Sequence, residues 1–243
     1  ALTKGLIERA AQVGYRTLIL TADVPALAPR PRDQRNGFTV PFRIRPRQFI
    51  DFCLHPRWSL MTLMRGIPKP QNISLPDGAS ELKSHEAGFR REAGRGRFDW
   101  RFLSELRSQW PHQLVLKGVM SAEDAKIAVS AGVDAVYVSN HGGRQLDSAP
   151  GAISVLPKVR EAVGPDFPLI FDSGVRSGED VARALASGAN FVMVGRPALY
   201  ALAAGGPSGF EGLLHLLMNE LSTVMARLGC RYTHELNEAV RVS

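Results

Sequence analysis

The chain has 243 residues, of which 44% are apolar and 22% charged, and its net charge is +7. These values are typical of a globular α/β protein in which one large domain buries a core. Cys53 and Cys230 match no metal-ligand or redox spacing, which excludes a disulfide-rich scaffold and predicts a reduced, cytoplasmic setting without a metal site. No apolar run reaches the roughly 20 residues that span a bilayer, and no signal peptide opens the chain.

The positive charge is concentrated in one segment. Nine basic residues but only two acids, Asp33 and Asp51, lie between Arg30 and Lys69, so this segment accounts for the whole net charge. The pattern of residues at about 38–97 is irregular and too long for an ordinary loop, which indicates an insertion. Its aromatic and basic residues at 38–72 favour an anionic membrane surface, with a loop covering the active site as the alternative. Nucleic-acid binding is not expected, because no known binding module accompanies the charge.

Outside this segment the chain alternates between helices and strands. The first helix is expected from Leu2 to Gly14, and apolar runs at 17–21, 114–117, 135–139, 169–172 and 192–195 predict five strands. Helices are expected at 98–109, 122–131, 153–163, 178–187 and 209–228. Each strand is a short apolar run, as in a parallel sheet that is buried on both faces.

Two segments of similar sequence, Ala131–Val138 and Ser187–Val194, each end a helix on glycine and begin a buried strand. This repeated unit favours a TIM (β/α)₈ barrel over a doubly wound sheet, and no Gly-x-Gly-x-x-Gly follows the first strand. A closed barrel has eight strands. Residues 1–243 are therefore expected to form the C-terminal part of one barrel domain, with roughly strands 4 to 8.

Polar residues and glycines follow each predicted strand, where the active site of such a barrel lies. The loops Asp172–Gly178 and Val194–Pro197 combine glycine, arginine and a following helix, a composition typical of phosphate sites. The alternative is that the glycines only form turns and that the arginines are solvated.

The segment that follows the strand at 135–139 combines residues suited to acid–base chemistry. His141 can act as a general base, Asp23 can orient it, and Arg144 can bind a carboxylate in bidentate fashion. Lys117 can stabilise negative charge on a reduced cofactor or an oxyanion. A lone histidine near glycine is more often structural, and a lysine at the exposed end of a strand is common.

Five motifs occur in a fixed order along the chain: Thr21–Pro25, Leu116–Gly118, Ser139–Gln145, Asp172–Arg176 and Gly195–Pro197. In this order they resemble the FMN-dependent 2-hydroxy-acid dehydrogenases and oxidases from about Thr3 to Leu236. The resemblance implies that three further strands precede Ala1, together with a tyrosine that faces the substrate.

The resemblance also implies individual roles. His141 would be the base that acts on the 2-hydroxy acid, with Asp23 as its partner, and Arg144 and Arg30 would bind the substrate carboxylate. Whether His141 removes the α-proton or the hydroxyl proton stays open. Eight residues would contact FMN: Thr21 and Ser139 near the ring system, Lys117 at flavin N1 and O2, and Asp172, Gly174, Arg176, Gly195 and Arg196 around the ribityl phosphate.

Two departures from the usual family pattern bear on the branch. Pro29 stands where the family often has a second arginine, and Asp172–Gly174 reads Asp-Ser-Gly where Asp-Gly-Gly is commoner. The second variant, together with the segment Cys53–Leu60, resembles the mandelate dehydrogenase branch, in which the equivalent insertion binds membranes.

The branch implies oxidation of a mandelate-like (S)-2-hydroxy acid to the 2-keto acid, with electrons passed to a membrane quinone. The alternatives are an L-lactate dehydrogenase and an oxidase that uses oxygen. A hypothesis of another class is a non-catalytic, truncated half-barrel that depends on a partner chain. A homotetramer is expected from the resemblance, located in the cytoplasm or peripherally on the cytoplasmic face of a membrane.

Overall fold

The computed structural model describes residues 2–24, 31–37, 44–66 and 98–239. The chain divides into two compact units, one of residues 1–15 and 29–95 and the other of residues 16–28 and 96–243. The second unit contains the sheet and all but one of the predicted site residues. Arg30, predicted to bind the substrate carboxylate, lies outside the described residues.

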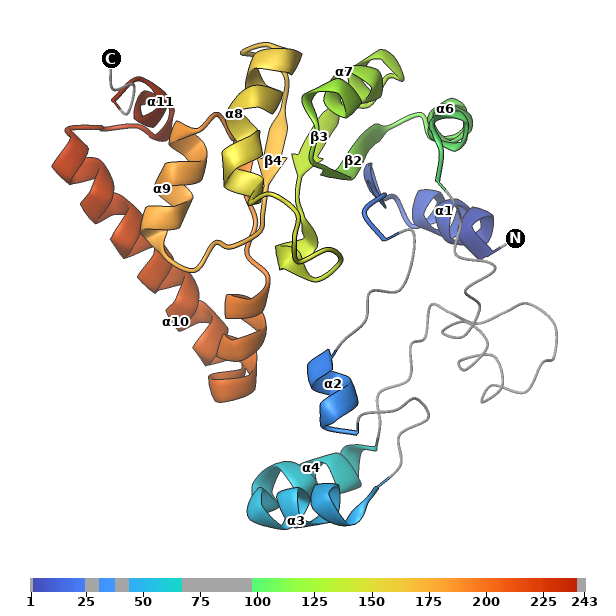
Figure 1. Cartoon of the computed structure of the whole chain (residues 1–243), viewed down its shortest axis with the longest axis vertical. Helices are drawn as coiled ribbons and strands as arrows, with labels where there is room; N and C mark the ends of the chain where they lie inside the picture. The colour runs from blue at the N-terminus through green and yellow to red at the C-terminus, as the bar shows by residue number, and fades with distance from the viewer. Residues whose placement is uncertain (1, 25–30, 38–43, 67–97, 240–243) are drawn as a thin grey trace. The chain divides into compact units, whose positions relative to one another are not determined.

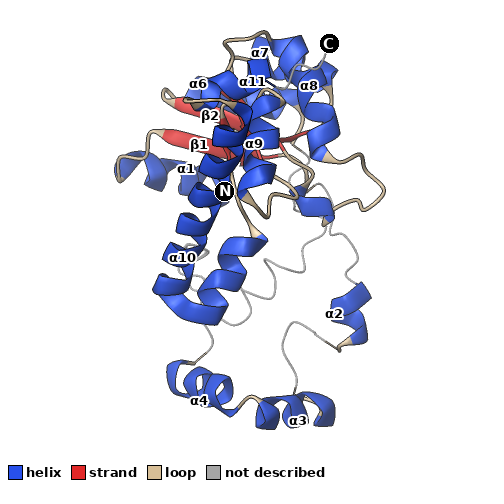
Figure 2. Cartoon of the chain, turned by 90° about the vertical axis from the view of Figure 1, so that its left-hand side faces the viewer, coloured by secondary structure: helices blue, strands red, loops and turns tan. Residues whose placement is uncertain are grey.

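The second unit contains a parallel sheet of five strands (Figures 1 and 2). Its strands follow one another in chain order, and each pairs in parallel with the next. They are β1 (Thr17–Thr21), β2 (Gln113–Val119), β3 (Ala135–Val138), β4 (Leu169–Phe171) and β5 (Phe191–Val192). This confirms the five predicted strands and the order that a (β/α)₈ barrel requires.

Helices connect the strands, so that each βα unit lies beside the next (Figure 1). They are α6 (Trp100–Gln109), α7 (Ala122–Ser130), α8 (Ala152–Val163), α9 (Gly178–Ala186), α10 (Arg196–Leu228) and α11 (Leu236–Ala239). Helix α7 packs against α8, and α9 packs against α10 and α11. Two boundaries differ from the prediction by more than two residues. Strand β5 is shorter, and α10 begins before residue 209 and is interrupted at Gly206, where φ is +61° and Pro207 follows.

The predicted helix starts are capped by side chains. The Ser121 hydroxyl accepts a hydrogen bond from the backbone N–H of Asp124 at the start of α7. At the start of α9, Ser177 and Asp180 form a capping box. Such caps satisfy backbone N–H groups that have no partner within the helix, and each typically contributes about 1 kcal/mol. They therefore fix where each helix leaves its strand-end loop.

The two segments of similar sequence are also structurally equivalent. Asp134, before β3, accepts hydrogen bonds from a backbone N–H of β2 and from Arg107 of α6, both at 2.7 Å. Asn190, before β5, accepts in the same way from a backbone N–H of β4, at 2.8 Å, and from Arg160 of α8, at 2.7 Å. The repeat seen in the sequence is therefore a repeat of side-chain contacts between each helix and the start of the following strand.

The described residues of the first unit form four helices: α1 (Leu2–Gln12), α2 (Pro31–Arg35), α3 (Pro46–Leu54) and α4 (Pro56–Arg65). The last three lie within residues 30–97, and α3 and α4 lie in the part at 38–97 whose sequence pattern is irregular. Each begins on a proline, which suits the first helical position because the N–H that proline lacks has no helical partner there. The prolines that interrupted the pattern are therefore helix starts.

Helices α3 and α4 are joined through His55 and contact each other, and residues 46–65 are called the α3–α4 hairpin (Figures 1 and 2). The ring centroids of Phe52 and Trp58 are 5.4 Å apart, and the Ser59 hydroxyl donates to the carbonyl of Phe52 at 2.8 Å. Eight large apolar side chains of the hairpin remain exposed: Phe49, Ile50, Leu54, Trp58, Leu60, Met61, Leu63 and Met64. Among the helices described, none is long and apolar enough to cross a membrane.

Candidate active site

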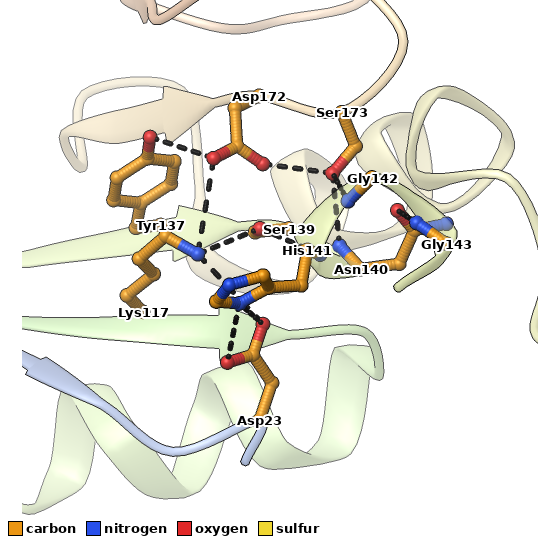
Figure 3. Close-up of polar contacts among 10 residues, drawn as sticks. All are labelled: Asp23, Lys117, Tyr137, Ser139, Asn140, His141, Gly142, Gly143, Asp172 and Ser173. Carbon is orange, nitrogen blue, oxygen red and sulfur yellow. Dashed lines mark hydrogen bonds and ion pairs between the residues drawn. The ribbon is translucent and has the colours of Figure 1, made fainter. Parts of the chain in front are cut away.

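The carboxyl ends of β1 to β4 bring together five residues predicted from separate motifs (Figure 3). Parallel strands end at the same edge of a sheet, so the residues that follow them become neighbours although they are far apart in sequence. The five residues are Asp23, Lys117, Ser139, His141 and Asp172. Thr21, predicted near the flavin ring, ends β1 and pairs with Lys117 in the sheet.

The imidazole of His141 pairs with the carboxylate of Asp23. Its Nδ1 lies 3.2 Å from each carboxylate oxygen. The Asp23 side chain is 10% exposed and that of His141 is 35% exposed, so the imidazole lies between the carboxylate and the solvent-accessible cleft. When Nδ1 carries the proton and donates a hydrogen bond to Asp23, the other ring nitrogen, Nε2, has a free lone pair. This is the arrangement of a general base oriented by an acid.

Gly118 allows Asp23 to approach β2 closely. Its φ is +100°, and a Cβ at this position would come within 2.5 Å of the Asp23 Cβ. The pairing of β2 with β3 shifts register between Lys117 and Val119, as at a β-bulge. A side chain at position 118 would therefore displace the carboxylate that contacts His141.

Lys117 lies among polar groups from the neighbouring strands. Its Nζ donates to the Ser139 hydroxyl at 2.9 Å and lies 3.7 Å from Asp23 and 3.8 Å from Asp172. The ammonium is also 5.1 Å from the centre of the Tyr137 ring. Because it lines the cleft and is only 15% exposed, Lys117 can present a fixed positive charge to a bound group.

His141 lies in a short 3₁₀ turn, η2 (His141–Gly143), with an unusual backbone. Its φ is +58°, which is uncommon for a residue with a side chain, and both following glycines also have positive φ. The backbone N–H groups of Asn140 and Gly142 both donate to the Ser173 hydroxyl at 3.1 Å. The N–H of His141 donates to the Ser139 hydroxyl at the same distance.

Tyr137 lies two residues before Ser139 on β3, and its side chain is directed to the same group of residues (Figure 3). Its hydroxyl donates to Asp172 Oδ2 at 2.9 Å, and the residue is 4% exposed. Burial raises the pKa of Tyr137 well above its ordinary value of about 10, and the charge of Asp172 raises it further. The phenol therefore stays protonated and remains a hydrogen-bond donor.

A cleft of about 720 Å³ opens beside these residues. Lys117 and His141 line one part of it, and Met193, Leu199 and Tyr200 provide apolar surface. The predicted phosphate residues Asp172, Gly174, Arg176, Gly195 and Arg196 also line it, as does Arg144, the predicted carboxylate ligand.

The cleft has the chemistry that FMN requires. A Cβ built at Gly174 or Gly195 would meet no atom within 4 Å, so both glycines leave room for a ligand. Arg176 and Arg196 supply positive charge near the phosphate loops, and Lys117 supplies it at the other predicted contact. The volume of the cleft lies within the range of about 300–1,000 Å³ that is usual for cofactor sites.

Sequence reasoning missed Tyr137 and the role of the Ser173 hydroxyl. The signal for Tyr137 was its position two residues before Ser139, because alternate residues of a strand face the same side. The signal for Ser173 was the departure from Asp-Gly-Gly, since serine occupies a position where φ is +84° and glycine would be unstrained.

The comparisons with known proteins cover nearly the whole chain. The profile of the family described as FMN-dependent dehydrogenase matches residues 1–242. An (S)-mandelate dehydrogenase of Pseudomonas putida is 40% identical over 94% of this chain and 57% of its own length. An L-lactate oxidase of a Nostoc species is 38% identical over 97% of this chain and 59% of its own length.

Solved structures give a consistent result. A crystal structure described as the monotopic membrane protein (S)-mandelate dehydrogenase matches with a TM-score of 0.90 and 39% identity. The match covers 97% of this chain and 62% of that one. The chain thus spans about three fifths of the length of these relatives.

Proposed function

The chain belongs to the FMN-dependent dehydrogenase family, as its motifs predicted, and we propose that its protein oxidises an (S)-2-hydroxy acid to the 2-keto acid. The observation that carries this proposal is the pair of His141 and Asp23 beside a cleft lined by Lys117 and three arginines. A base beside a positively charged cleft suits an anionic substrate that must lose protons.

The protein residues divide the work between binding and proton transfer. Arg144 binds the substrate carboxylate, together with Arg30. His141 Nε2 takes one of the two protons that the substrate loses as its C2–O bond becomes a carbonyl. The carboxylate of Asp23 stabilises the imidazolium that results, because the two groups are in contact and largely shielded from solvent.

Residues from five strand ends would hold FMN. The residues around its ribityl phosphate would be Asp172, Gly174, Arg176, Gly195 and Arg196. Lys117, Ser139 and Thr21 would lie at the ring system, where the ammonium stabilises negative charge. The chemistry that bound FMN would supply is that of an acceptor for the two electrons and for the second of the two protons that the substrate loses.

An aromatic, mandelate-like substrate is the first choice within this class. The support is the resemblance around the α3–α4 hairpin and the 40% identity to a mandelate dehydrogenase. L-lactate is the second choice, because several lactate enzymes are 35–38% identical to this chain. The small difference in identity means that substrates must be compared directly.

Anaerobic titration of the FMN-loaded protein with (S)-mandelate, L-lactate and glycolate tests the proposal. Bleaching of the oxidised flavin spectrum by one of these acids is the expected result, fastest with (S)-mandelate. The matched variant His141→Gln should bind FMN normally but reduce it about 10²–10⁴-fold more slowly. A loaded protein whose spectrum none of the acids changes contradicts the proposed activity.

We also propose that the α3–α4 hairpin binds an anionic membrane surface, so that electrons can pass to a membrane quinone. The support is its exposed apolar side chains together with Arg45, Arg47, Arg57 and Arg65, against the single acid Asp51 in the described part of the segment. Apolar residues mixed with arginine suit the interface between lipid headgroups and acyl chains.

Sedimentation with vesicles tests the membrane proposal. The protein should sediment with vesicles that contain anionic lipid and remain in solution with neutral ones. Replacing Phe49 and Leu63 by serine should release it, whereas Ile127→Ser, an exposed apolar residue on α7, should leave sedimentation unchanged. Equal sedimentation of the two variants contradicts the assignment.

A further inference from the structure

We propose that Tyr137, Asp172 and Ser173 form a positioning relay that holds the turn bearing His141 in its reactive conformation. The proposal rests on the proposed function only in that it takes His141 as the base. The contacts of the relay itself do not depend on the identity of the substrate (Figure 3).

The turn needs support from outside itself. Three consecutive residues, 141–143, have positive φ values of 58°, 68° and 75°. A residue with a side chain, such as His141, seldom adopts this conformation unless its surroundings impose it. The backbone N–H groups of the turn therefore need acceptors at fixed positions.

Ser173 supplies one such acceptor, which serves two backbone N–H groups. Its hydroxyl oxygen accepts hydrogen bonds from Asn140 N and Gly142 N, both at 3.1 Å, which brackets His141 on either side. The hydroxyl donates its own hydrogen to Asp172 Oδ1 at 2.8 Å. A hydroxyl has one hydrogen and two lone pairs, so these three bonds use its full capacity and leave it one orientation.

Asp172 fixes the orientation of that hydroxyl and is itself held in place. Its second oxygen, Oδ2, accepts from the buried Tyr137 hydroxyl at 2.9 Å and lies 3.8 Å from Lys117 Nζ. The protein thus uses both oxygens of a residue predicted only as a flavin contact. The relay runs from Tyr137 through Asp172 and Ser173 to the two backbone N–H groups.

The conformation of Ser173 indicates that its hydroxyl matters. At φ +84° a glycine would be free of strain, whereas serine is not. The strained residue nevertheless makes three hydrogen bonds that glycine cannot make. Comparing Ser173→Gly with Ser173→Ala therefore separates the effect of strain from the effect of the hydroxyl.

Hydrogen exchange and steady-state kinetics test the relay in the FMN-loaded protein. In both Ser173 variants, backbone amides 140–143 should exchange about tenfold faster, since each lost bond leaves an N–H unpaired. The kcat should fall about tenfold and KM should change less than twofold, because the base is misplaced while Arg144 is untouched. In the two Ser173 variants, hydrogen exchange in α8 should stay at the wild-type rate. The control variant Ser154→Ala removes an exposed hydroxyl, and its amides 140–143 should also exchange at the wild-type rate.

Tyr137→Phe tests the other end of the relay should the Ser173 variants fail to fold. It keeps the ring beside Lys117 but removes the donor to Asp172, so amides 140–143 should again exchange faster. The relay is overturned if these amides exchange at the wild-type rate in Tyr137→Phe. It is also overturned if Ser173→Gly has both wild-type exchange and wild-type kcat. The exchange readout stands even if no 2-hydroxy acid reduces the flavin, so failure of the relay and failure of the proposed activity are distinguishable.

Discussion

His141 Nδ1 lies 3.2 Å from both carboxylate oxygens of Asp23, although the two residues follow different strands of the sheet. The contact directs one imidazole nitrogen to the acid and leaves the other for the substrate. The same geometry orients the histidine in serine-hydrolase triads, where the acid does not itself take up the proton.

Asp23→Asn should lower the rate of flavin reduction about 10²–10⁴-fold, as expected when a general base loses its orienting acid. The amide side chain has nearly the same size, so folding and FMN affinity should change little. Stopped-flow reduction measures the rate, and quenching of FMN fluorescence measures the affinity. A variant that reduces FMN at the wild-type rate would show that His141 acts without Asp23.

Gly118→Ala should damage both stability and activity. The added Cβ would meet the Asp23 Cβ at 2.5 Å, and φ at this position is +100°. Overpacking and backbone strain typically cost about 1–3 kcal/mol each, measured as a loss in the free energy of unfolding.

Gly212→Ala is the matched control for this change. Gly212 lies inside α10, where an added Cβ meets no atom within 4 Å, so alanine should stabilise the protein by about 0.5–1 kcal/mol. If both substitutions have the same effect, the close approach at Gly118 is not the cause.

Arg176→Ala should weaken FMN binding, because a charge-assisted hydrogen bond to phosphate contributes about 1.5–3 kcal/mol, or roughly 10- to 150-fold in Kd. Fluorescence titration of the apoprotein with FMN measures the change. Arg183→Ala removes an exposed arginine of α9 that pairs with Glu179, and it should leave Kd unchanged. Equal effects of the two substitutions would place the phosphate elsewhere.

Tyr137 should make stability depend on alkaline pH. The pKa of Tyr137 is raised in the folded protein. Its contribution to the free energy of unfolding is therefore fully present below about pH 10, the ordinary pKa of tyrosine. Above that pH the unfolded state loses the phenol proton and the folded state keeps it, so the free energy of unfolding falls, by at most about 1.4 kcal/mol per pH unit.

Chemical denaturation between pH 9 and 11 measures this dependence. Tyr137→Phe should show a shallower decline than the wild type, whatever the change in its stability at neutral pH. Tyr232→Phe, which alters an exposed tyrosine, should decline like the wild type. Parallel curves for all three proteins contradict the prediction.

Much of the fold could be predicted from sequence because its signals are local. The apolar run Ala135–Val138 and the cap at Ser121 each act within a few residues. The meeting of Asp23 and His141 could also be anticipated, because it follows from the shared edge of a parallel sheet and from the family motifs.

The missed features depend on contacts between distant residues or on ambiguous residue types. The bond from Tyr137 to Asp172 spans 35 positions, and no local pattern predicts which of two neighbouring strands a tyrosine reaches. The prolines at 46 and 56 suggested irregular structure, because proline breaks a helix internally but favours its first position.

The paired contacts of Arg107 and Arg160 have a consequence for how such a chain can be assembled. Each arginine leaves the end of one helix and binds carbonyl oxygens of the loop that follows its own helix. Each also binds the loop that begins the next βα unit but one along the chain, through Asp134 before β3 or Asn190 before β5. One side chain thus joins two successive βα units. A gene segment that encodes such a unit also encodes the arginine that contacts a neighbouring unit. Duplication of the segment therefore reproduces this contact between units.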